Sequence, residues 1–373
     1  MPEIYATGFE DRLKQSTIVL IQLHCFDHKV SYFRLAEFVV WISNPDGGDI
    51  AHEFQYILKN YNFECAVHLA CHKFCNMFSS SSWLHLRIPF SYFLLPVFLF
   101  SLAISPNVSQ QPLLLTFVIV HLFLYPASNG YNSYFDKDEK SIGGLEKPPP
   151  VTTGLYYLSL LFDAIAILLG LIFINVTFAI MLLIYGLVSK AYSHPAIRLK
   201  KMPITGWIIA GLFQGLFTFA MCYIGINKYG FENIFKASVL IPGMLSTIML
   251  WANYPMTQIY QHEEDAKRGD MTFSRLLGIK GTFYFVGATF VIVTICFIFY
   301  FNSYFNIRYS TLFLAALFPV TAYFFYWFII TMKDLQQADY RHTMWLNFIS
   351  STCLNTFFVY LFLDTTNIAQ SFR

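Results

Sequence analysis

Nine long apolar stretches fill most of the chain after residue 83, and they limit its fold more than any other feature. A helix needs about 20 mostly apolar residues to cross a bilayer. Backbone polar groups in lipid must bond within their own segment, so such stretches are expected to be helical. We therefore predict an all-α polytopic membrane protein. The expected spans are 84–104, 112–135, 155–174, 177–193, 204–225, 234–259, 283–301, 309–332 and 342–363.

The composition agrees with a membrane location. Only 12% of the residues are charged, whereas soluble proteins carry about 25%. The 41 Phe and 24 Tyr suit the interior and the edges of a bilayer. The net charge of +2 gives no reason to expect a nucleic-acid partner. We expect the lipid bilayer to be the main environment of this chain.

The first 82 residues differ in character from the rest, since polar, aromatic and charged residues are mixed there up to a run of serines. We divide the chain into an N-terminal extension, 1–82, and a membrane domain, 83–373. Two interpretations of the extension stay open. It is either a loosely folded appendage, or partly an artefact of gene calling if translation starts at Met77.

The loops after the even-numbered spans hold most of the basic residues of the membrane domain. By the positive-inside rule these loops face the cytoplasm. We expect an integral protein of the cell's inner membrane. The basic residues on this side are Lys137, Lys140, Lys147, Lys190, Arg198, Lys200, Lys201, Lys267, Arg268, Arg275, Lys280, Lys333 and Arg341, and those on the other side are Lys228, Lys236, Arg308 and Arg373.

An acidic cluster follows the second span. Asn132 and Asp136 are four residues apart, so they lie on one face of a helix end. Asp138 and Glu139 extend the patch. Carboxylate and amide oxygens are hard ligands that suit Mg²⁺, an ion that often joins carboxylates to substrate phosphates.

A second acidic cluster follows the sixth span. Gln261 and Asp265 repeat the four-residue spacing, Glu264 and Asp270 add negative charge, and Lys267 and Arg268 add positive charge. Such a mixture suits a metal-bridged anion, because cations neutralise phosphate oxygens. The alternative for each cluster is a solvated loop with incidental charge. That alternative is weaker for two clusters at matching helix ends on one face.

The loop after the fourth span is a candidate phosphate-binding loop. It carries Lys190, Arg198, Lys200 and Lys201 with few acids nearby. Basic loops beside a membrane also arise from topology alone, so both interpretations stay open.

These motifs resemble those of the UbiA superfamily of intramembrane prenyltransferases. Its first motif is N-x-x-x-D-x-x-x-D, in which Asn132 and Asp136 match and Lys140 replaces the last acid. Its second motif is D-x-x-x-D followed by G-x-x-[ST]. There Gln261 replaces the first acid and Asp265 matches the second. The resemblance covers roughly 84–363 and also includes Gly269, Thr272, the R-x-P of Arg87 and Pro89, and the Tyr192, Ser193, Arg198, Lys200 and Lys201 loop.

The resemblance implies a bundle with a central cavity and Mg-dependent transfer of a prenyl group from a prenyl diphosphate. The acceptor is expected to be lipophilic: aromatic, a quinone precursor or a lipid. Asp136 and Asp265 would be catalytic. The implied Mg²⁺ ligands are Asn132, Asp136, Asp138, Glu264, Asp265 and Asp270, and the implied diphosphate ligands are Lys190, Arg198, Lys200, Lys201, Lys267 and Arg268.

Two other functions stay open. The first is an inactive UbiA-like protein, because Lys140 and Gln261 replace acidic residues of the UbiA motifs. A transporter would place its polar residues along helix interiors at the midplane, whereas here they gather at one face. Three further polar residues, Asp163, Asn253 and His262, each have a functional and a purely structural interpretation.

Overall fold

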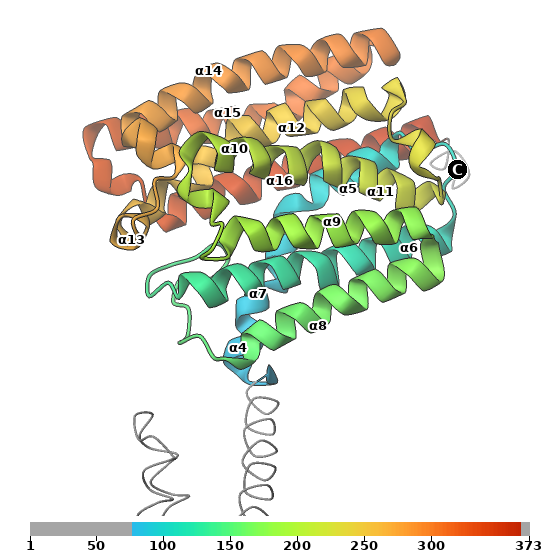
Figure 1. Cartoon of the computed structure of the whole chain (residues 1–373). Helices are drawn as coiled ribbons and strands as arrows, with labels where there is room; N and C mark the ends of the chain where they lie inside the picture. Colours follow the sequence, from blue (N-terminus) through green and yellow to red (C-terminus); the bar gives the residue numbers. More distant parts are fainter. Residues whose placement is uncertain (1–76, 367–373) are drawn as a thin grey trace, which may run out of the picture. The chain divides into compact units, whose positions relative to one another are not determined.

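The computed structural model describes residues 77–366. The predictions for the extension up to residue 76 concern residues outside this range, as does the tail from residue 367. Within the described part, nine helical stretches are long and apolar enough to cross a membrane, which confirms the predicted number (Figure 1). They are Ser80–Ala103, Gln110–Asp136, Gly154–Ile174, Val176–Ser193, Pro203–Asn227, Ala237–Arg268, Phe273–Tyr304, Ile307–Lys333 and Tyr340–Thr365.

Most spans consist of more than one helical segment. Pro89 and Pro96 fit this because proline is tolerated in the first turn of a helix and breaks the turn before it. The segments are α4 (Ser80–Leu86), η1 (Ile88–Leu94), α5 (Leu95–Ala103), α6 (Gln110–Val118), η2 (Ile119–Leu124), α7 (Tyr125–Asp136), α8 (Gly154–Leu169), η3 (Gly170–Ile174), α9 (Val176–Ser193), η4 (Leu199–Lys201), α10 (Pro203–Leu212), η5 (Phe213–Phe217), α11 (Thr218–Asn227), η6 (Phe231–Asn233), α12 (Ala237–Gln258), η7 (Ile259–Gln261), α13 (His262–Arg268), α14 (Phe273–Tyr304), α15 (Ile307–Lys333), η8 (Leu335–Gln337) and α16 (Tyr340–Thr365).

The region between the sixth and seventh spans differs from the expectation. We expected a loop from 260 to 282, but α13 continues the sixth span and α14 begins at Phe273. The helix α13 has acids in its first turn and bases in its last, which complements the helix dipole. Gly269 ends it with a φ of 72°, the left-handed conformation that glycine adopts most readily. Gly278, with a φ of 68°, kinks α14.

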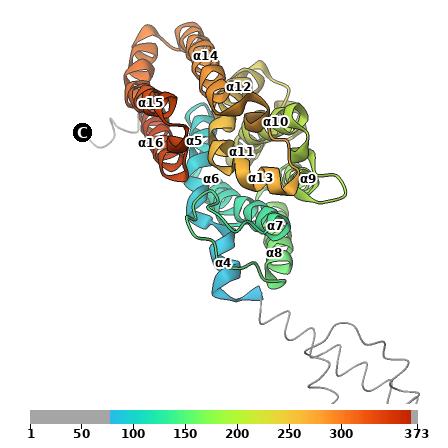
Figure 2. The same ribbon diagram turned by 90° about the vertical axis from the view of Figure 1, so that its left-hand side faces the viewer.

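The spans run side by side (Figure 2). They pack through apolar and aromatic contacts. Phe100 of α5 stacks on Phe358 of α16, with ring centroids 4.5 Å apart. Gly215 lets η5 approach α12 closely, because a Cβ there would lie 2.5 Å from the Cα of Thr247. Small residues at such crossings are typical of membrane bundles.

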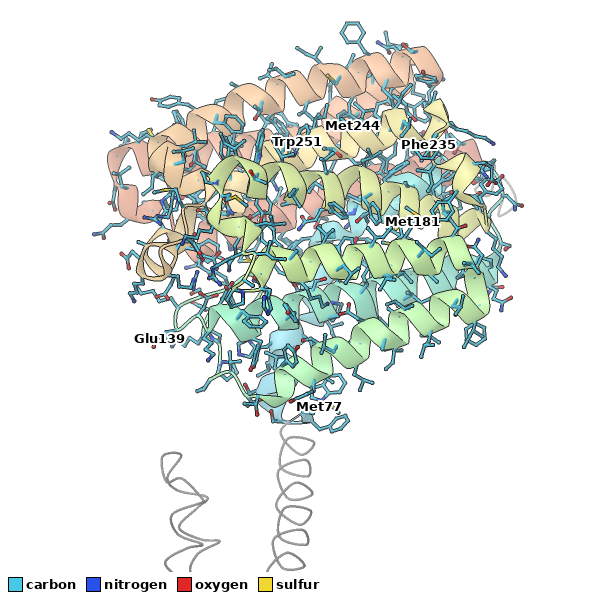
Figure 3. The ribbon with its side chains drawn as sticks, in the orientation of Figure 1. Met77, Glu139, Met181, Phe235, Met244 and Trp251 are labelled. Carbon is cyan, nitrogen blue, oxygen red and sulfur yellow. The ribbon has the colours of Figure 1, made fainter. Side chains whose placement is uncertain are left out.

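Polar elements gather at one end of the bundle. The loop after α7 and the helix α13 both lie at the left in Figure 1. Figure 3 places the exposed Glu139 at that end and Phe235, 75% exposed, at the other. The two acidic clusters therefore belong to one rim of the bundle.

Candidate active site

Both acidic clusters open onto one cavity of about 240 Å³. Asp136 is the last residue of α7, and Asp265 lies in the first turn of α13. Both line the cavity. Residues from the two motifs therefore line the same cavity. The other polar residues of the cavity wall include Arg87, Ser128, Asn129, Asn132, Ser133, Asp138, Ser189, Tyr192, Ser193, Lys200, Gln214, Tyr254, Thr257, Gln258, Tyr260, Gln261, Arg268 and Thr272.

Asp136 lies at a helix end that Lys137 closes in the left-handed conformation, with a φ of 49°. Its side chain accepts a hydrogen bond from the Lys200 ammonium and another from Arg198 Nη2 at 3.4 Å. Asp136 is only 8% exposed. The basic loop after α9 thus supplies the cations that neutralise the first acidic cluster.

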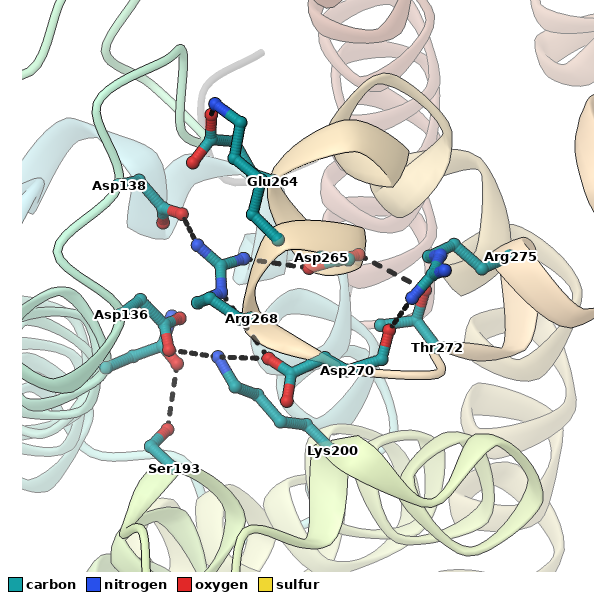
Figure 4. A network of polar contacts seen from close by, with 12 residues as sticks. Asp136, Asp138, Ser193, Lys200, Glu264, Asp265, Arg268, Asp270, Thr272 and Arg275 are labelled. Carbon is teal, nitrogen blue, oxygen red and sulfur yellow. Dashed lines mark hydrogen bonds and ion pairs between the residues drawn. The ribbon is translucent and has the colours of Figure 1, made fainter.

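Arg268 joins the two clusters, as Figure 4 shows. It donates to Asp138 from the first cluster and to Asp265 Oδ1 at 2.8 Å, and its Nε lies 3.4 Å from Asp270 Oδ2. Thr272 also donates to Asp265 Oδ2 at 3.2 Å. A single guanidinium therefore bridges a carboxylate of the loop after the second span and a carboxylate at the end of the sixth span.

Asp270 is fully buried behind this wall. It accepts from Arg198 Nε at 2.7 Å and from Arg198 Nη2 at 2.8 Å. Burial disfavours its ionised form, but the hydrogen bonds from Arg198 and the charges of Lys200 and Arg198 outweigh burial and lower the pKa of Asp270. Asp270 is a carboxylate at neutral pH, and it fixes Arg198 beside Asp136.

The pKa of Asp138 shifts in the opposite direction from that of Asp270. Burial and the charge of Asp136 raise the pKa of Asp138, and Arg268 only partly opposes them. A cation that entered beside Asp136 and Asp138 would therefore relieve a repulsion that already exists between these carboxylates.

The chain matches the sequence profile of the UbiA prenyltransferase family over residues 93–351, which is more than half of its length. The chain belongs to the UbiA prenyltransferase family. No curated protein matches it.

Solved structures of UbiA homologues share its fold. One from Archaeoglobus fulgidus, bound to GPP and Mg²⁺, is 17% identical with a TM-score of 0.54, and the match covers 76% of this chain and 99% of that one. The homologue bound to DMAPP and Mg²⁺ is 18% identical, with the same TM-score and coverage. A third structure of the homologue is 18% identical with a TM-score of 0.51, covering 75% of this chain and 99% of that one.

The two departures from the UbiA motifs have different surroundings. Lys140, at the third position of the first motif, forms an exposed ion pair with Glu263 and does not line the cavity. Gln261, at the first position of the second motif, does line the cavity. Asn132 lines it too, and its Oδ1 accepts a hydrogen bond from Ser193 at 2.8 Å.

Some of the expected diphosphate and metal ligands lie elsewhere. Lys190 pairs with the buried Asp163 of α8 and lies 5.1 Å from the centre of the Tyr131 ring. Lys267 is 60% exposed and pairs with Glu264 at 3.1 Å. Lys201 is exposed. These four predicted ligands, Lys190, Lys201, Glu264 and Lys267, do not line the cavity in the described part of the chain, and neither do the predicted ligands Arg198 and Asp270.

Four tyrosines also line the cavity, and of these the sequence motifs include only Tyr192. The hydroxyls of Tyr192 and Tyr254 lie 2.6 Å apart and join α9 to α12. Tyr185 and Tyr260 add aromatic surface. Aromatic residues are so common in this chain that their spacing could not single these out.

Asn253 and His262, which the sequence analysis named together with Asp163, lie outside the first cavity. His262 Nε2 lies 2.8 Å from Ser274 Oγ and ties α13 to α14. Asn253 lines a second, largely apolar cavity of about 130 Å³. That cavity lies between α12 and the helices α5, α14, α15 and α16.

The donor set of the first cavity fits Mg²⁺ in its chemistry. Asp136, Asp138 and Asp265 offer carboxylate oxygens, and Asn132 offers an amide oxygen. In residues 77–366 no three His, Cys, Asp or Glu side chains already surround a common point. Lys200 and Arg268 form ion pairs with these carboxylates.

Proposed function

We propose that this integral membrane protein transfers a prenyl group from a prenyl diphosphate to a lipophilic acceptor with the help of Mg²⁺. The observation that carries the proposal is that Asp136 and Asp265, from separate spans, line one cavity with Lys200 and Arg268 between them. Alternating carboxylates and cations suit a metal-chelated diphosphate, because each phosphate oxygen finds either a metal or a hydrogen-bond donor.

The roles of the residues follow from their chemistry. Asn132, Asp136, Asp138 and Asp265 would hold Mg²⁺, and Lys200 and Arg268 would turn toward the diphosphate oxygens. Bound Mg²⁺ supplies Lewis-acid stabilisation of the charge on the diphosphate. The two cations stabilise the same charge through hydrogen bonds that are in place before the reaction. Arg198 and Asp270 would keep this wall in position from behind.

In the reaction the allylic carbon–oxygen bond breaks and its electron pair leaves with the diphosphate. A nucleophilic atom of the acceptor forms the new bond to that carbon and loses its proton. Tyr185, Tyr192 and Tyr254 line the cavity, and the faces of aromatic rings attract a developing cation. The apolar second cavity offers room for part of a lipophilic chain.

Relatives support the choice of ligands. The Archaeoglobus fulgidus homologue was solved with GPP and Mg²⁺ and with DMAPP and Mg²⁺. We infer the same classes of ligand here, and an aromatic, quinone-precursor or lipid acceptor. We also propose that the protein lies in an inner membrane and that the loops around the cavity are on its cytoplasmic side, because they carry most of the basic residues.

An inactive UbiA-like protein is the second candidate, favoured by Lys140 and Gln261. The outward direction of Lys140 weakens it, since this side chain leaves the cavity carboxylates undisturbed. A transporter gains no specific support from the polar residues, which concentrate at one rim.

The test is an assay of purified full-length protein in detergent. It contains Mg²⁺, geranyl, farnesyl or geranylgeranyl diphosphate and a panel of acceptors, and it measures diphosphate release and prenylated product. We expect Asp136→Ala and Asp265→Ala each to lower the rate by at least about 100-fold. Asp334→Ala, at an exposed position on another loop, is the matched control. Turnover that persists in the first two variants would refute the site.

A further inference from the structure

Gln214 is a polar residue of the first cavity that lies far from the charged rim. It belongs to the π-helical turn η5, near the middle of the fifth span, Pro203–Asn227. Since a helix rises about 1.5 Å per residue, Gln214 lies about 16 Å from Pro203, where the span leaves the basic loop. Its half-buried side chain lines the cavity. Polar side chains at the middle of a membrane span are rare and often functional.

Two threonines hold the backbone of η5 in its π-helical form. Thr218 Oγ1 donates to Phe213 O at 2.7 Å, and Thr247 Oγ1 of α12 accepts a hydrogen bond from Leu216 N at 2.8 Å. Backbone groups that leave the regular helical pattern inside a bilayer need such partners. Turns of this kind are rare and frequently occur at functional sites. The turn η5 therefore fixes the place of Gln214 on the cavity wall.

The side-chain amide of Gln214 forms no hydrogen bond with the part of the chain that the structure describes. Ser128 of α7 lines the same cavity, and its buried hydroxyl oxygen also lacks a hydrogen-bond partner among residues 77–366. Ser128 lies about 12 Å along the helix from Asp136 at the rim. Polar groups that are removed from water without a partner cost free energy. A hydrogen-bonding group that enters the cavity would remove this cost.

The deeper part of the cavity differs in charge from its rim. Tyr185 and Phe213 line this part, with ring centroids 6.5 Å apart. The wall there combines aromatic surface with uncharged hydrogen-bonding groups, which suits an uncharged ligand group better than an anion. The carboxylates and cations of the wall all lie at the rim or bind its loops, and they are Arg87, Asp136, Asp138, Lys200, Asp265 and Arg268.

We propose that Gln214 binds an uncharged oxygen group, a hydroxyl or a carbonyl, of the prenyl acceptor. An amide suits either group, because its NH₂ donates hydrogen bonds and its oxygen accepts them. The inference deepens the proposed function and rests on the cavity being the substrate site. The oxygen group belongs either to an aromatic ring, as in a phenol or quinone, or to the glycerol part of a lipid. Gln214 is thus a residue that determines which acceptor is used.

The experiment measures binding of acceptor-like probes without donor or Mg²⁺. Full-length protein undergoes equilibrium gel filtration in detergent that contains radiolabelled β-naphthol, monoolein or β-methylnaphthalene, and binding to protein-free micelles is subtracted. We expect the wild-type protein to bind β-naphthol or monoolein. Gln214→Met, which keeps the length of the side chain and removes the amide, should bind that probe at least about fivefold more weakly, as expected for one lost hydrogen bond.

The third probe separates hydrogen bonding from the shape of the cavity. β-Methylnaphthalene has the ring system of β-naphthol but no oxygen, so its affinity should change less than about twofold in Gln214→Met. Gln336→Met replaces an exposed glutamine outside the cavity and should leave all affinities unchanged. Weaker binding of β-naphthol by Gln214→Met assigns the oxygen group to an aromatic acceptor. Weaker binding confined to monoolein assigns it to a lipid.

Three results would overturn the proposal. The wild-type protein binds neither oxygen-bearing probe, Gln214→Met binds both of them normally, or Gln214→Met loses as much affinity for β-methylnaphthalene as for the other probes. The last result would mean that Gln214 only shapes the cavity. Should Gln214→Met fail to fold, Gln214→Leu is judged by the same pattern. Because donor and Mg²⁺ are absent, these outcomes are independent of whether the Asp136 and Asp265 variants lose turnover.

Discussion

Asp270 has no exposed surface, yet it is ionised because Arg198 and Lys200 surround it. Its pKa is lower in the folded chain than the ordinary value of about 4. Ionisation of Asp270 therefore stabilises the folded state above pH about 4, and this stabilisation is lost as the pH falls through the folded-state pKa.

We therefore expect Asp270→Asn to destabilise the protein at pH 7 by about 3 kcal/mol, the cost of breaking a buried ion pair. The difference from wild type should shrink below pH about 4, where the carboxyl group takes up a proton. Thermal unfolding in detergent at several pH values measures this. A constant difference from pH 7 to pH 3 would show that the charge of Asp270 has no part in stability.

Lys190 shows how a cation near the site can serve stability instead of binding. Its ammonium pairs with Asp163 between α8 and α9, and both side chains are largely buried. We expect Lys190→Gln to lower the melting temperature by several degrees, because it leaves Asp163 buried without a partner. The KM for the prenyl diphosphate should change less than about twofold.

The double variant Asp163→Asn/Lys190→Gln should regain much of the lost stability, since replacing both members of a buried pair is far less costly than removing one. Lys333→Gln, at an exposed position, controls for the loss of one positive charge. A tenfold rise in KM for Lys190→Gln with unchanged stability would show that Lys190 binds the diphosphate and would contradict its role in stability.

Among the elements, the loop after α7 and the helix α13 face each other across the rim of the cavity. Lys140 and Glu263 join them by an exposed ion pair, and Asp138 and Arg268 join them by a more buried one. Exposed pairs contribute little to stability because water and salt screen them. The buried pair is therefore the contact that fixes the two elements near Asp136 and Asp265.

This arrangement predicts the result of restoring the acid that the UbiA motif has at position 140. Because Lys140 does not line the cavity, Lys140→Asp should change the turnover rate less than about threefold. Lys140→Gln, which removes the charge without adding an acid, is the matched comparison. A tenfold gain confined to Lys140→Asp would mean that the site lacks a metal ligand that this position can supply.

The sequence predicted the spans well because apolar length is a property of each segment alone. Asn132, Asp136 and Asp265 line one cavity. The spacing of four residues predicted that Asn132 and Asp136 share a helix face, and the equal membrane side of the two loops predicted that Asp265 lies at the same rim. The helix α13 escaped prediction since it is short and polar. The pairing of Lys190 with Asp163, and of Lys267 with Glu264, depends on packing between or within elements that spacing alone does not reveal.

At the scale of the whole molecule, the bundle brings a polar rim and an apolar interior together. The acidic clusters lie at the ends of the second and sixth spans and in the loops that follow them. The loop after the fourth span carries Arg198 and Lys200, which pair with Asp136 and Asp270, whereas Arg268 at the end of the sixth span pairs with Asp138 and Asp265. Elements distant in the sequence thus meet at one cavity. These groups are therefore expected to act together on one ligand.

The most direct test is a double-mutant cycle on binding. The ligand is farnesyl thiodiphosphate, a slowly reacting donor analogue, titrated with Mg²⁺ into wild type, Asp136→Ala, Asp265→Ala and the double variant. A shared ligand predicts that each single variant binds at least about tenfold more weakly. The double variant should lose less than the product of the two effects, a coupling of at least about 0.5 kcal/mol. Wild-type affinity in either single variant, or losses that multiply fully, would contradict the account.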